Sequence, residues 1–120
     1  MNKQNLVLGA SPNPERYSYK ACVSLIKHGY NVIPFGKRKG NINGIEILTD
    51  QTLINKVHTI TIYLNPINQK QYYDLIIKLK PKRIIFNPGA ENPELEYIAD
   101  KAGIQIIEAC TLVMLSSHSY

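Results

Sequence analysis

The sequence is short of the features that mark membrane, secreted and metal-binding proteins. No apolar run among its 120 residues approaches the ~20 residues that a membrane-spanning helix needs. The run at residues 6–8 is too short for the apolar core of a signal peptide. The two cysteines, Cys22 and Cys110, form no C-x-x-C pair, which argues against zinc. We therefore expect one cytoplasmic domain over residues 1–120, no resident metal and two reduced, largely buried thiols, with a disulfide as the alternative.

Acidic side chains are also scarce. Asp and Glu number 9 against 14 Lys and Arg, which gives a formal net charge of +5. An excess of this sign favours an anionic partner. The densest basic run, at residues 37–39, is only three residues long and no nucleic-acid-binding motif accompanies it. A small anionic ligand is therefore favoured over nucleic acid, and a solvated basic loop is the alternative.

Apolar runs rich in β-branched residues alternate with helical patterns, and no linker, repeat or low-complexity segment interrupts them. This alternation predicts a three-layer α/β fold, with a mostly parallel sheet of five to six strands and helices on both faces. Strands are expected at residues 5–10, 31–35, 45–48, 57–64, 83–87 and 104–108. Helices are expected at about 15–28, from Asn65 to just before Pro81, and from Asn92 to Gly103, with a brief helical turn from Thr49 or Asp50 to about Asn55. Residues 109–120 are expected to close the sheet edge, or alternatively to contact a second copy in a homodimer.

Parallel α/β sheets bind ligands beyond the carboxyl ends of their strands, which restricts the search for a site to four loops. These loops are Gly9–Tyr19, Phe35–Lys39, Asn65–Pro66 and Asn87–Asn92.

The first of these loops lacks two of the three glycines of the dinucleotide fingerprint G-x-G-x-x-G. Gly9 is present, but Ser11 and Pro14 occupy the other two positions. Gly9 allows a sharp turn, and we expect free backbone amides from Gly9 to Ser11 and at the following helix start to favour a pyrophosphate. A Cβ at position 11 keeps a dinucleotide from its closest approach. A simple strand-to-helix turn is the alternative.

The second loop lacks the acidic residue that accepts hydrogen bonds from the ribose of NAD. Lys37 follows the second strand instead, 28 residues after Gly9. Lysine has no acceptor, but it neutralises a phosphate. This loop therefore predicts a phosphorylated ribose, as in NADP or in the 3′-phosphate end of coenzyme A.

Four ordered stretches together resemble one known family. They are Val7–Ser18, His28–Pro34, Ile42–Ile47 and Asn87–Asn92. Over about residues 5–115 the chain resembles the small stand-alone CoA-binding proteins, which share the Rossmann-like fold of the CoA-binding domain in the succinyl-CoA synthetase alpha subunit. The resemblance implies coenzyme A or an acyl-CoA as the ligand.

The resemblance also implies a role for particular residues of this chain. The pyrophosphate would lie against Gly9, Ala10 and Ser11, with Arg16 and Tyr19 nearby; Lys37 would meet the adenosine end; Asn65 and Pro66 would face the cofactor; and Pro88, Gly89, Ala90, Glu91 and Asn92 would follow the pantetheine arm. Two positions depart from the family pattern. Phe35-Gly36 precedes Lys37 where relatives often carry Asn-Pro, and Asn65 stands where relatives often carry a cation.

The sequence contains no recognisable catalytic constellation. None of the three histidines falls in the four loops, and His28 is expected to interact with a helix carboxyl end. Glu91 is the one carboxylate expected in the cleft, as a loop-shaping residue rather than a base. Tyr17 or Tyr19 either stacks on the ligand or packs on its helix. We expect a non-catalytic CoA-binding protein, a sensor or carrier; an NADP-dependent enzyme and a ligand-free interaction protein are the alternatives.

Overall fold

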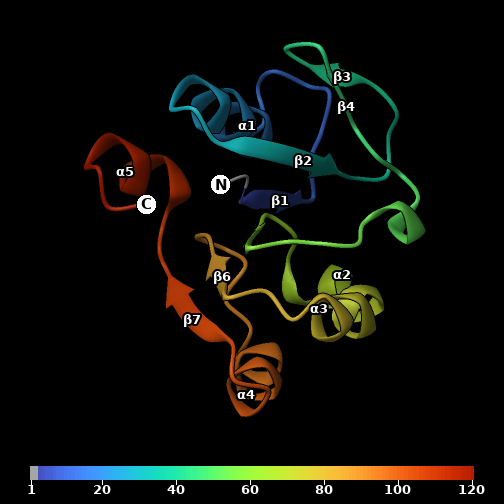
Figure 1. Cartoon of the computed structure of the whole chain (residues 1–120), viewed down its shortest axis with the longest axis vertical. Coiled ribbons are helices and arrows are strands. Elements are labelled where there is room, and N and C mark those ends of the chain that lie inside the picture. Colours follow the sequence, from blue (N-terminus) through green and yellow to red (C-terminus); the bar gives the residue numbers. More distant parts are fainter. Residues whose placement is uncertain (1–2) are drawn as a thin grey trace.

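The computed structural model describes residues 3–120 and contains a five-stranded parallel sheet in the order β2-β1-β5-β6-β7 (Figure 1). The sheet strands are β1 (Gln4–Leu8), β2 (Asn31–Phe35), β5 (Thr59–Ile62), β6 (Arg83–Phe86) and β7 (Gln105–Glu108). The helices are α1 (Tyr17–Lys27), α2 (Pro66–Gln69), α3 (Tyr73–Leu79), α4 (Pro93–Lys101) and α5 (Thr111–Ser116), with 3₁₀ turns η1 (Gln51–Leu53) and η2 (Lys70–Tyr72). The predicted α/β class is confirmed.

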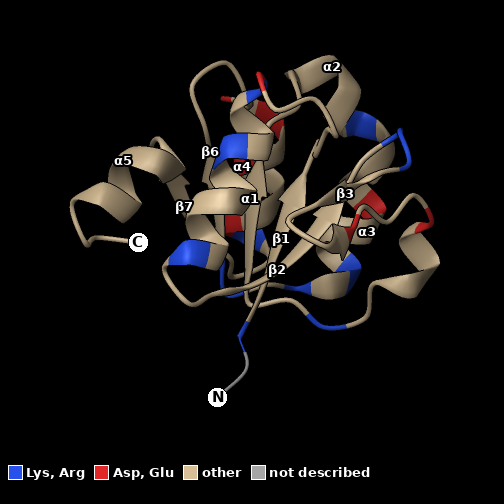
Figure 2. Ribbon diagram, turned by 90° about the horizontal axis from the view of Figure 1, so that it is seen from above, with Lys and Arg blue, Asp and Glu red and all other residues tan. Residues whose placement is uncertain are grey.

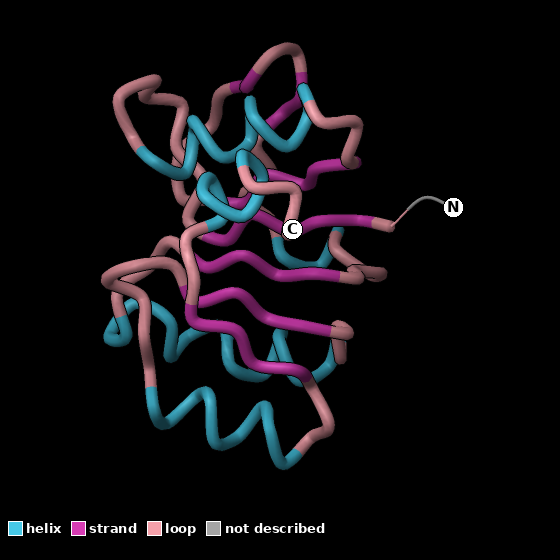
Figure 3. The backbone as a smooth tube through the Cα atoms, turned by 90° about the vertical axis from the view of Figure 1, so that its left-hand side faces the viewer, coloured by secondary structure: helices cyan, strands magenta, loops and turns pink. Residues whose placement is uncertain are grey.

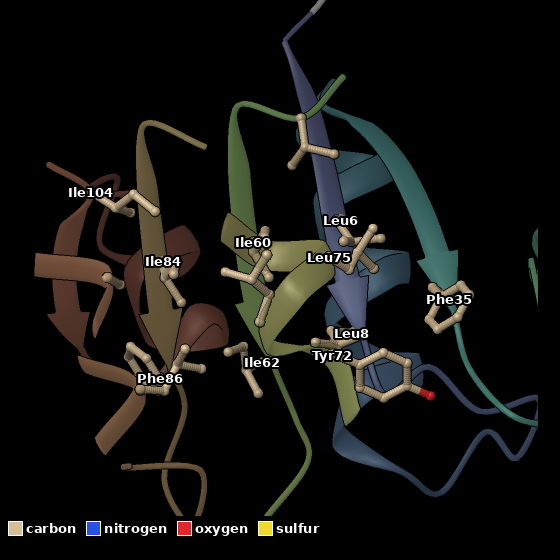
Figure 4. Close-up of a cluster of buried hydrophobic side chains, with 14 of the residues drawn as sticks. Leu6, Leu8, Phe35, Ile60, Ile62, Tyr72, Leu75, Ile84, Phe86 and Ile104 are labelled. Atoms are coloured by element: carbon tan, nitrogen blue, oxygen red, sulfur yellow. The ribbon is translucent and has the colours of Figure 1, made fainter. Parts of the chain in front are cut away.

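The sheet is covered on both faces. Alternate side chains of a strand point to opposite faces, and both sets are buried in the central strands. One set packs against α3 and α4, and Figure 4 shows Leu6, Ile60 and Ile84 side by side across three strands of this face. The other set includes Val7 and packs against α1, the segment after β2 and α5. Figure 1 accordingly places α1 and α5 on one side of the sheet and α2, α3 and α4 on the other.

Short polar caps begin two of the helices as predicted. The Asn65 side chain accepts a hydrogen bond from the amide of Asn68, and the Asn92 side chain accepts one from the amide of Leu95; a proline follows each cap. The helix expected to continue to Pro81 is instead interrupted by η2. No helix in residues 3–120 is long and apolar enough to cross a membrane.

The strand expected at residues 45–48 does not join the main sheet as a full strand. Residues 45–46 form β4 (Ile45–Glu46), which pairs antiparallel with β3 (Asn41–Ile42). The turn between them is Asn43-Gly44, and both residues have positive φ, 50° and 84°. These are the residues and dihedrals of a two-residue hairpin turn, whose twist suits an antiparallel pair. Only Leu48 reaches the sheet, through a single parallel bridge to Phe35.

The strand order creates a crevice at one end of the sheet. β1 lies between β2 and β5, so the chain first adds a strand on one side of β1 and later returns to its other side. The connections leave the carboxyl ends of β1 and β5 in opposite directions, which opens a space beyond them. Figure 3 shows the strands running in one direction, with their amino ends on the side of the N-terminal trace and their carboxyl ends on the other.

Candidate functional site

A cleft of about 640 Å³ lies at this switch point, beyond the carboxyl ends of the strands. It is lined by the loops that follow four neighbouring strands. The lining residues are Gly9, Ala10, Ser11, Pro12, Asn13, Glu15, Arg16, Tyr17 and Ser18 after β1; Phe35, Gly36, Lys37 and Arg38 after β2; Tyr63, Leu64 and Tyr72 after β5; and Pro88 after β6. Six of the residues predicted from the sequence are thereby brought together: Gly9, Ala10, Ser11, Arg16, Lys37 and Pro88.

The amides of Gly9 and Ala10 are not free, contrary to the expectation from the sequence. Both donate to the carbonyl oxygen of Phe35, each over 2.9 Å. Gly9 has φ +100°, and a Cβ there would lie 3.1 Å from the Leu64 side chain. The glycine therefore lets the chain turn under Leu64 and reach the end of β2. Of the three amides expected to be free, only that of Ser11 donates to no acceptor within residues 3–120, so the loop supplies mainly the shape of the cleft wall.

The free amides lie instead at the start of α1. Within residues 3–120, the amides of residues 17–19 have no acceptor, and the preceding residue, Arg16, makes no side-chain cap. α2 and α4, in contrast, are both capped by asparagine. The chain approaches α1 through tight polar turns, in which Ser11 Oγ accepts from the amide of Asn13 and Asn13 Oδ1 accepts from the amide of Glu15. An uncapped helix start beside a guanidinium favours a phosphate.

The loop after β2 brings cations to the same cleft. Lys37 and Arg38 line it, and Figure 2 shows the basic segment between β2 and β3. A Cβ at Gly36 would collide with the carbonyl oxygen of Ala10, so only glycine allows the two loops to approach this closely. The amide of Gly36 also donates to the carbonyl of Leu48 over 3.0 Å. The Phe35-Gly36 pair is thus what joins the basic loop to the first loop.

The opposite end of the cleft is apolar. Leu64, Tyr72 and Pro88 line it, and the rings of Phe35 and Tyr72 meet edge to face with centroids 5.5 Å apart. In Figure 4 the Tyr72 hydroxyl points away from the labelled apolar side chains. Burial raises the pKa of Tyr72, so the phenol stays protonated and can donate a hydrogen bond.

The turn at residues 88–92, which was predicted to follow the pantetheine arm, is held by a network of buried polar side chains. Asn92 is 4% exposed, and its Nδ2 donates to Gln69 Oε1 and to the Tyr73 hydroxyl, each over 2.8 Å. Gln69 Nε2 in turn donates to the carbonyl of Ala90 over 2.8 Å. Neither Asn92 nor Ala90 lines the cleft; they fix the backbone of the turn.

The carboxylate of the cleft is Glu15, and the expectation for Glu91 needs correction. Glu91 does not line the cleft; its Oε1 accepts from the amide of Gly89 over 2.8 Å and shapes the turn. Glu15 was expected to begin the first helix, but α1 starts only at Tyr17, so Glu15 belongs instead to the irregular approach to this helix and lines the cleft.

The other predicted residues take part in local structure. Asn65 and Pro66 begin α2, and neither lines the cleft. The side chain of Tyr19 packs against the core on the α1 face, whereas Tyr17 lines the cleft and is 70% exposed, with Lys20 Nζ 5.4 Å from its ring centre.

The histidines and cysteines are not among the described residues that line this cleft. His28 Nδ1 lies 2.7 Å from the carbonyl oxygen of Ser24 at the carboxyl end of α1, as predicted. Cys22 and Cys110 are free thiols, and burial raises the pKa of Cys22 to about 12, so it stays protonated at neutral pH. Residues 3–120 contain no cluster of three or more His, Cys, Asp or Glu side chains that could hold a metal ion.

Comparison with known proteins agrees with this architecture of an α/β domain with a cleft at the strand ends. A family model described as CoA binding domain matches residues 3–116, and the chain belongs to this family. A crystal structure titled only as an uncharacterized protein is 47% identical, with a TM-score of 0.95 over 100% of this chain and 99% of that one. A hypothetical protein from Pyrococcus horikoshii OT3 is 27% identical, with a TM-score of 0.84 over 97% and 82%.

A Thermus thermophilus protein at 22% identity shares the fold, with a TM-score of 0.86 over 99% of this chain and 91% of that one. A comparison with curated proteins gave no match.

Proposed function

We propose that this protein binds coenzyme A or an acyl-CoA in the cleft at the carboxyl end of the sheet, without catalysing a reaction. The observation that carries this proposal is the polarity of the cleft. Cations lie at the β2 end, free helix amides lie beyond β1, and apolar side chains lie beyond β5 and β6. Coenzyme A presents its groups in the same order, from a phosphorylated ribose through a pyrophosphate to an uncharged arm whose dimethyl and methylene groups can pack against apolar side chains.

The length of the cleft suits an extended ligand. Neighbouring strands are ~4.8 Å apart, so the four strands β2, β1, β5 and β6 separate Lys37 from Pro88 by about 14 Å across the sheet. The first two positions are cationic or amide-rich, where a pyrophosphate and a ribose phosphate gain charge-assisted hydrogen bonds. The last two expose Leu64 and Pro88, against which a pantetheine arm would pack.

Specificity over a dinucleotide rests on two side chains. Lys37 follows β2 at the place where an acidic residue would accept hydrogen bonds from an unmodified ribose. Ser11 places a Cβ at the position of the second fingerprint glycine, and this limits how closely a dinucleotide approaches. The first feature favours a ribose that carries a phosphate, and the second disfavours a dinucleotide.

A non-catalytic role fits the side chains of the cleft. Among the described residues that line it, Glu15 is the only acidic group, and histidine and cysteine do not occur. A general base would need a partner that holds it over the reacting atom. Glu15 lies instead on the irregular approach to α1, where its backbone amide donates to Asn13 Oδ1.

The proposal is tested by calorimetric titration with CoA, acetyl-CoA, dephospho-CoA, NADP and NAD. We expect CoA and acetyl-CoA to bind, and dephospho-CoA to bind about tenfold more weakly because it lacks the ribose phosphate that Lys37 neutralises. Lys37→Ala should weaken CoA by the same factor and leave dephospho-CoA nearly unchanged. Lys70→Ala, an exposed lysine outside the cleft, is the matched control.

Each of the other outcomes has a defined meaning. Preference for NADP over CoA would replace this proposal with a nucleotide-dependent enzyme. Failure of all five compounds to bind or to raise the melting temperature would indicate an interaction protein that keeps the fold without the ligand.

A further inference from the structure

A second hollow of about 420 Å³ lies at the amino end of the same sheet, opposite the cleft described above. It is lined by residues at or just before the starts of all five strands and by the last residue of the chain: Lys3, Asn5, Tyr30, His58, Lys82, Arg83, Gln105 and Tyr120. Among these described residues, three are permanently cationic and one is a histidine, and none has an acidic side chain. Nothing in the proposed function uses this hollow.

The floor of the hollow is a polar row across the sheet. Asn5, Thr59, Arg83 and Gln105 are successive partners in the strand register. Asn5 is 2% exposed and Thr59 is fully buried. Buried polar groups are costly unless they are paired, and here Thr59 Oγ1 accepts from Arg83 Nε while Asn5 Oδ1 accepts from the Tyr120 hydroxyl. This row is therefore a fixed platform, built on strands rather than on loops.

Arg83 is held in one orientation on this platform. Its Nε donates to Thr59 Oγ1 over 2.9 Å, and its guanidinium carbon lies 4.5 Å from the centre of the Tyr120 ring. Tyr120 is fixed in turn, since its hydroxyl donates to Asn5 Oδ1 over 2.8 Å and its ring meets Tyr30 edge to face. These contacts use the Nε of the guanidinium and one of its faces. Arg83 also lines the hollow, so the part of its guanidinium that Thr59 and Tyr120 do not use is placed to donate to a phosphate oxygen.

His58 and Lys82 complete a cationic ring around this guanidinium. The amide of Lys82 donates to the carbonyl of His58 over 2.9 Å, so both backbones are locked. His58 Nδ1 lies 2.8 Å from Thr59 Oγ1, which leaves Nε2 available. Burial lowers the pKa of His58, and the charges of Lys3, Arg83 and Lys82 lower it further. Tyr30 and Tyr120 are the other titratable side chains that line the hollow. The imidazole thus lies in a positive field set by Lys3, Arg83 and Lys82, and no acidic side chain is among the described residues that line the hollow.

We propose that the hollow at the amino end of the sheet is a second anion site, which binds a small phosphate anion such as pyrophosphate between Arg83, Lys82, Lys3 and His58. The anion would neutralise the cations that now repel a proton from His58. Binding would therefore take up a proton at His58 and strengthen as the pH falls. This proposal stands independently of whether CoA occupies the cleft at the other end.

An NMR titration of the whole chain with pyrophosphate tests whether the anion binds in the amino-end hollow. The histidine resonances are followed during the titration. His58 should shift, and its pKa should rise in the complex, while His28 and His118, which lie outside the hollow, serve as internal controls. Sulfate, whose charge stays constant between about pH 5 and 8, is the probe for the pH dependence. Affinity for sulfate should increase as the pH is lowered through the pKa of His58.

Substitution of the cationic residues distinguishes binding in this hollow from nonspecific attraction of anions to a basic protein. Lys82→Gln and Arg83→Gln should each lower the affinity for pyrophosphate about tenfold, as expected for the loss of a charge-assisted contact. Lys70→Gln removes the same charge from an exposed position outside both cavities and should change it less than about twofold. Lys82 is exposed, so its variant remains informative even if Arg83→Gln fails to fold.

Two results would overturn the proposal. One is a His58 resonance that does not respond to pyrophosphate while the protein stays folded. The other is an equal loss of affinity in Lys82→Gln and Lys70→Gln, which would show attraction by net charge alone. Retention of pyrophosphate binding when saturating CoA is present would distinguish this site from the phosphate-binding part of the cleft.

Discussion

The two ends of the sheet build their basic cavities in different ways. At the carboxyl end, loops of varied length supply backbone amides, a helix start, two loop cations and an apolar wall. At the amino end, residues at or just before the strand starts line the cavity, and every charged side chain among these described residues is cationic. The first arrangement can discriminate along the length of an extended ligand. The second offers a compact and rigid cluster of charge, which suits a small anion.

The largest effect should come from Gly36→Ala at the carboxyl end. The new Cβ would collide with the carbonyl oxygen of Ala10 and push apart the two loops that share the Phe35 carbonyl. We expect a loss of about 3 kcal/mol in the free energy of unfolding, measured in urea, and loss of CoA binding. Pyrophosphate should still shift the His58 resonance, because the amino end is unchanged. Equal damage at both ends would show that the cavities are not independent.

The second prediction compares two helix caps behind the cleft. Asn92→Ala should lower the free energy of unfolding by about 2–3 kcal/mol, because it removes a cap and also the Nδ2 donor to Gln69 Oε1 and to the Tyr73 hydroxyl oxygen. Asn65→Ala removes an exposed cap alone and should cost about 1 kcal/mol. Equal losses in urea unfolding would mean that the buried network contributes nothing beyond capping.

The third prediction concerns the floor of the amino-end hollow. Tyr120→Phe removes the donor to the buried Oδ1 of Asn5 but keeps the ring under Arg83. The free energy of unfolding should fall by about 1–2 kcal/mol, while pyrophosphate affinity stays near that of the parent. Tyr97→Phe, at a ring that is 65% exposed, is the matched control and should change stability by less than about 0.5 kcal/mol. A large drop in affinity in Tyr120→Phe would show that the hydroxyl itself contacts the anion.

The smallest effect should be the pH dependence due to His58. Its pKa in the folded protein lies below the ordinary value of 6.5, so the unfolded chain binds the proton more tightly. Stability should therefore fall as the pH drops below about 6.5 toward the lower, folded-state pKa. The shift in melting temperature should be only ~1 °C, because the group is partly exposed. His58→Gln should remove this slope, and sulfate should reduce it in the parent; an unchanged slope in His58→Gln would assign it to other groups.

The fold was predictable because the buried strands and the half-buried helices leave distinct patterns of apolar residues in the sequence. β2 matches its predicted bounds, and the other sheet strands are shorter than predicted at one or both ends, as is usual where strand ends fray into loops. The asparagine-proline pairs at Asn65 and Asn92 marked helix starts because cap chemistry is local. Asn43-Gly44 carried an equally local hairpin signal that was overlooked.

The site was less predictable because it depends on contacts between distant loops. The positions of Gly9 and Lys37 in the sequence indicated a common cleft, and the structure places both residues in its lining. The bonds from the amides of Gly9 and Ala10 to Phe35 could not be read from spacing, because they depend on how two loops meet. The hollow around Arg83 was missed for another reason: the rule for parallel sheets directed the search to the other end.

The shared acceptor at Phe35 has a consequence for how a ligand would enter. Since the Phe35 carbonyl oxygen accepts from the amides of Gly9 and Ala10, and the Gly36 amide donates to the carbonyl of Leu48, three hydrogen bonds hold the main chain where the two loops meet. Access must then depend on rotation of long exposed side chains such as Arg16 and Lys37. Such rotations take nanoseconds or less, so the encounter would be fast and would require little reorganisation of the backbone.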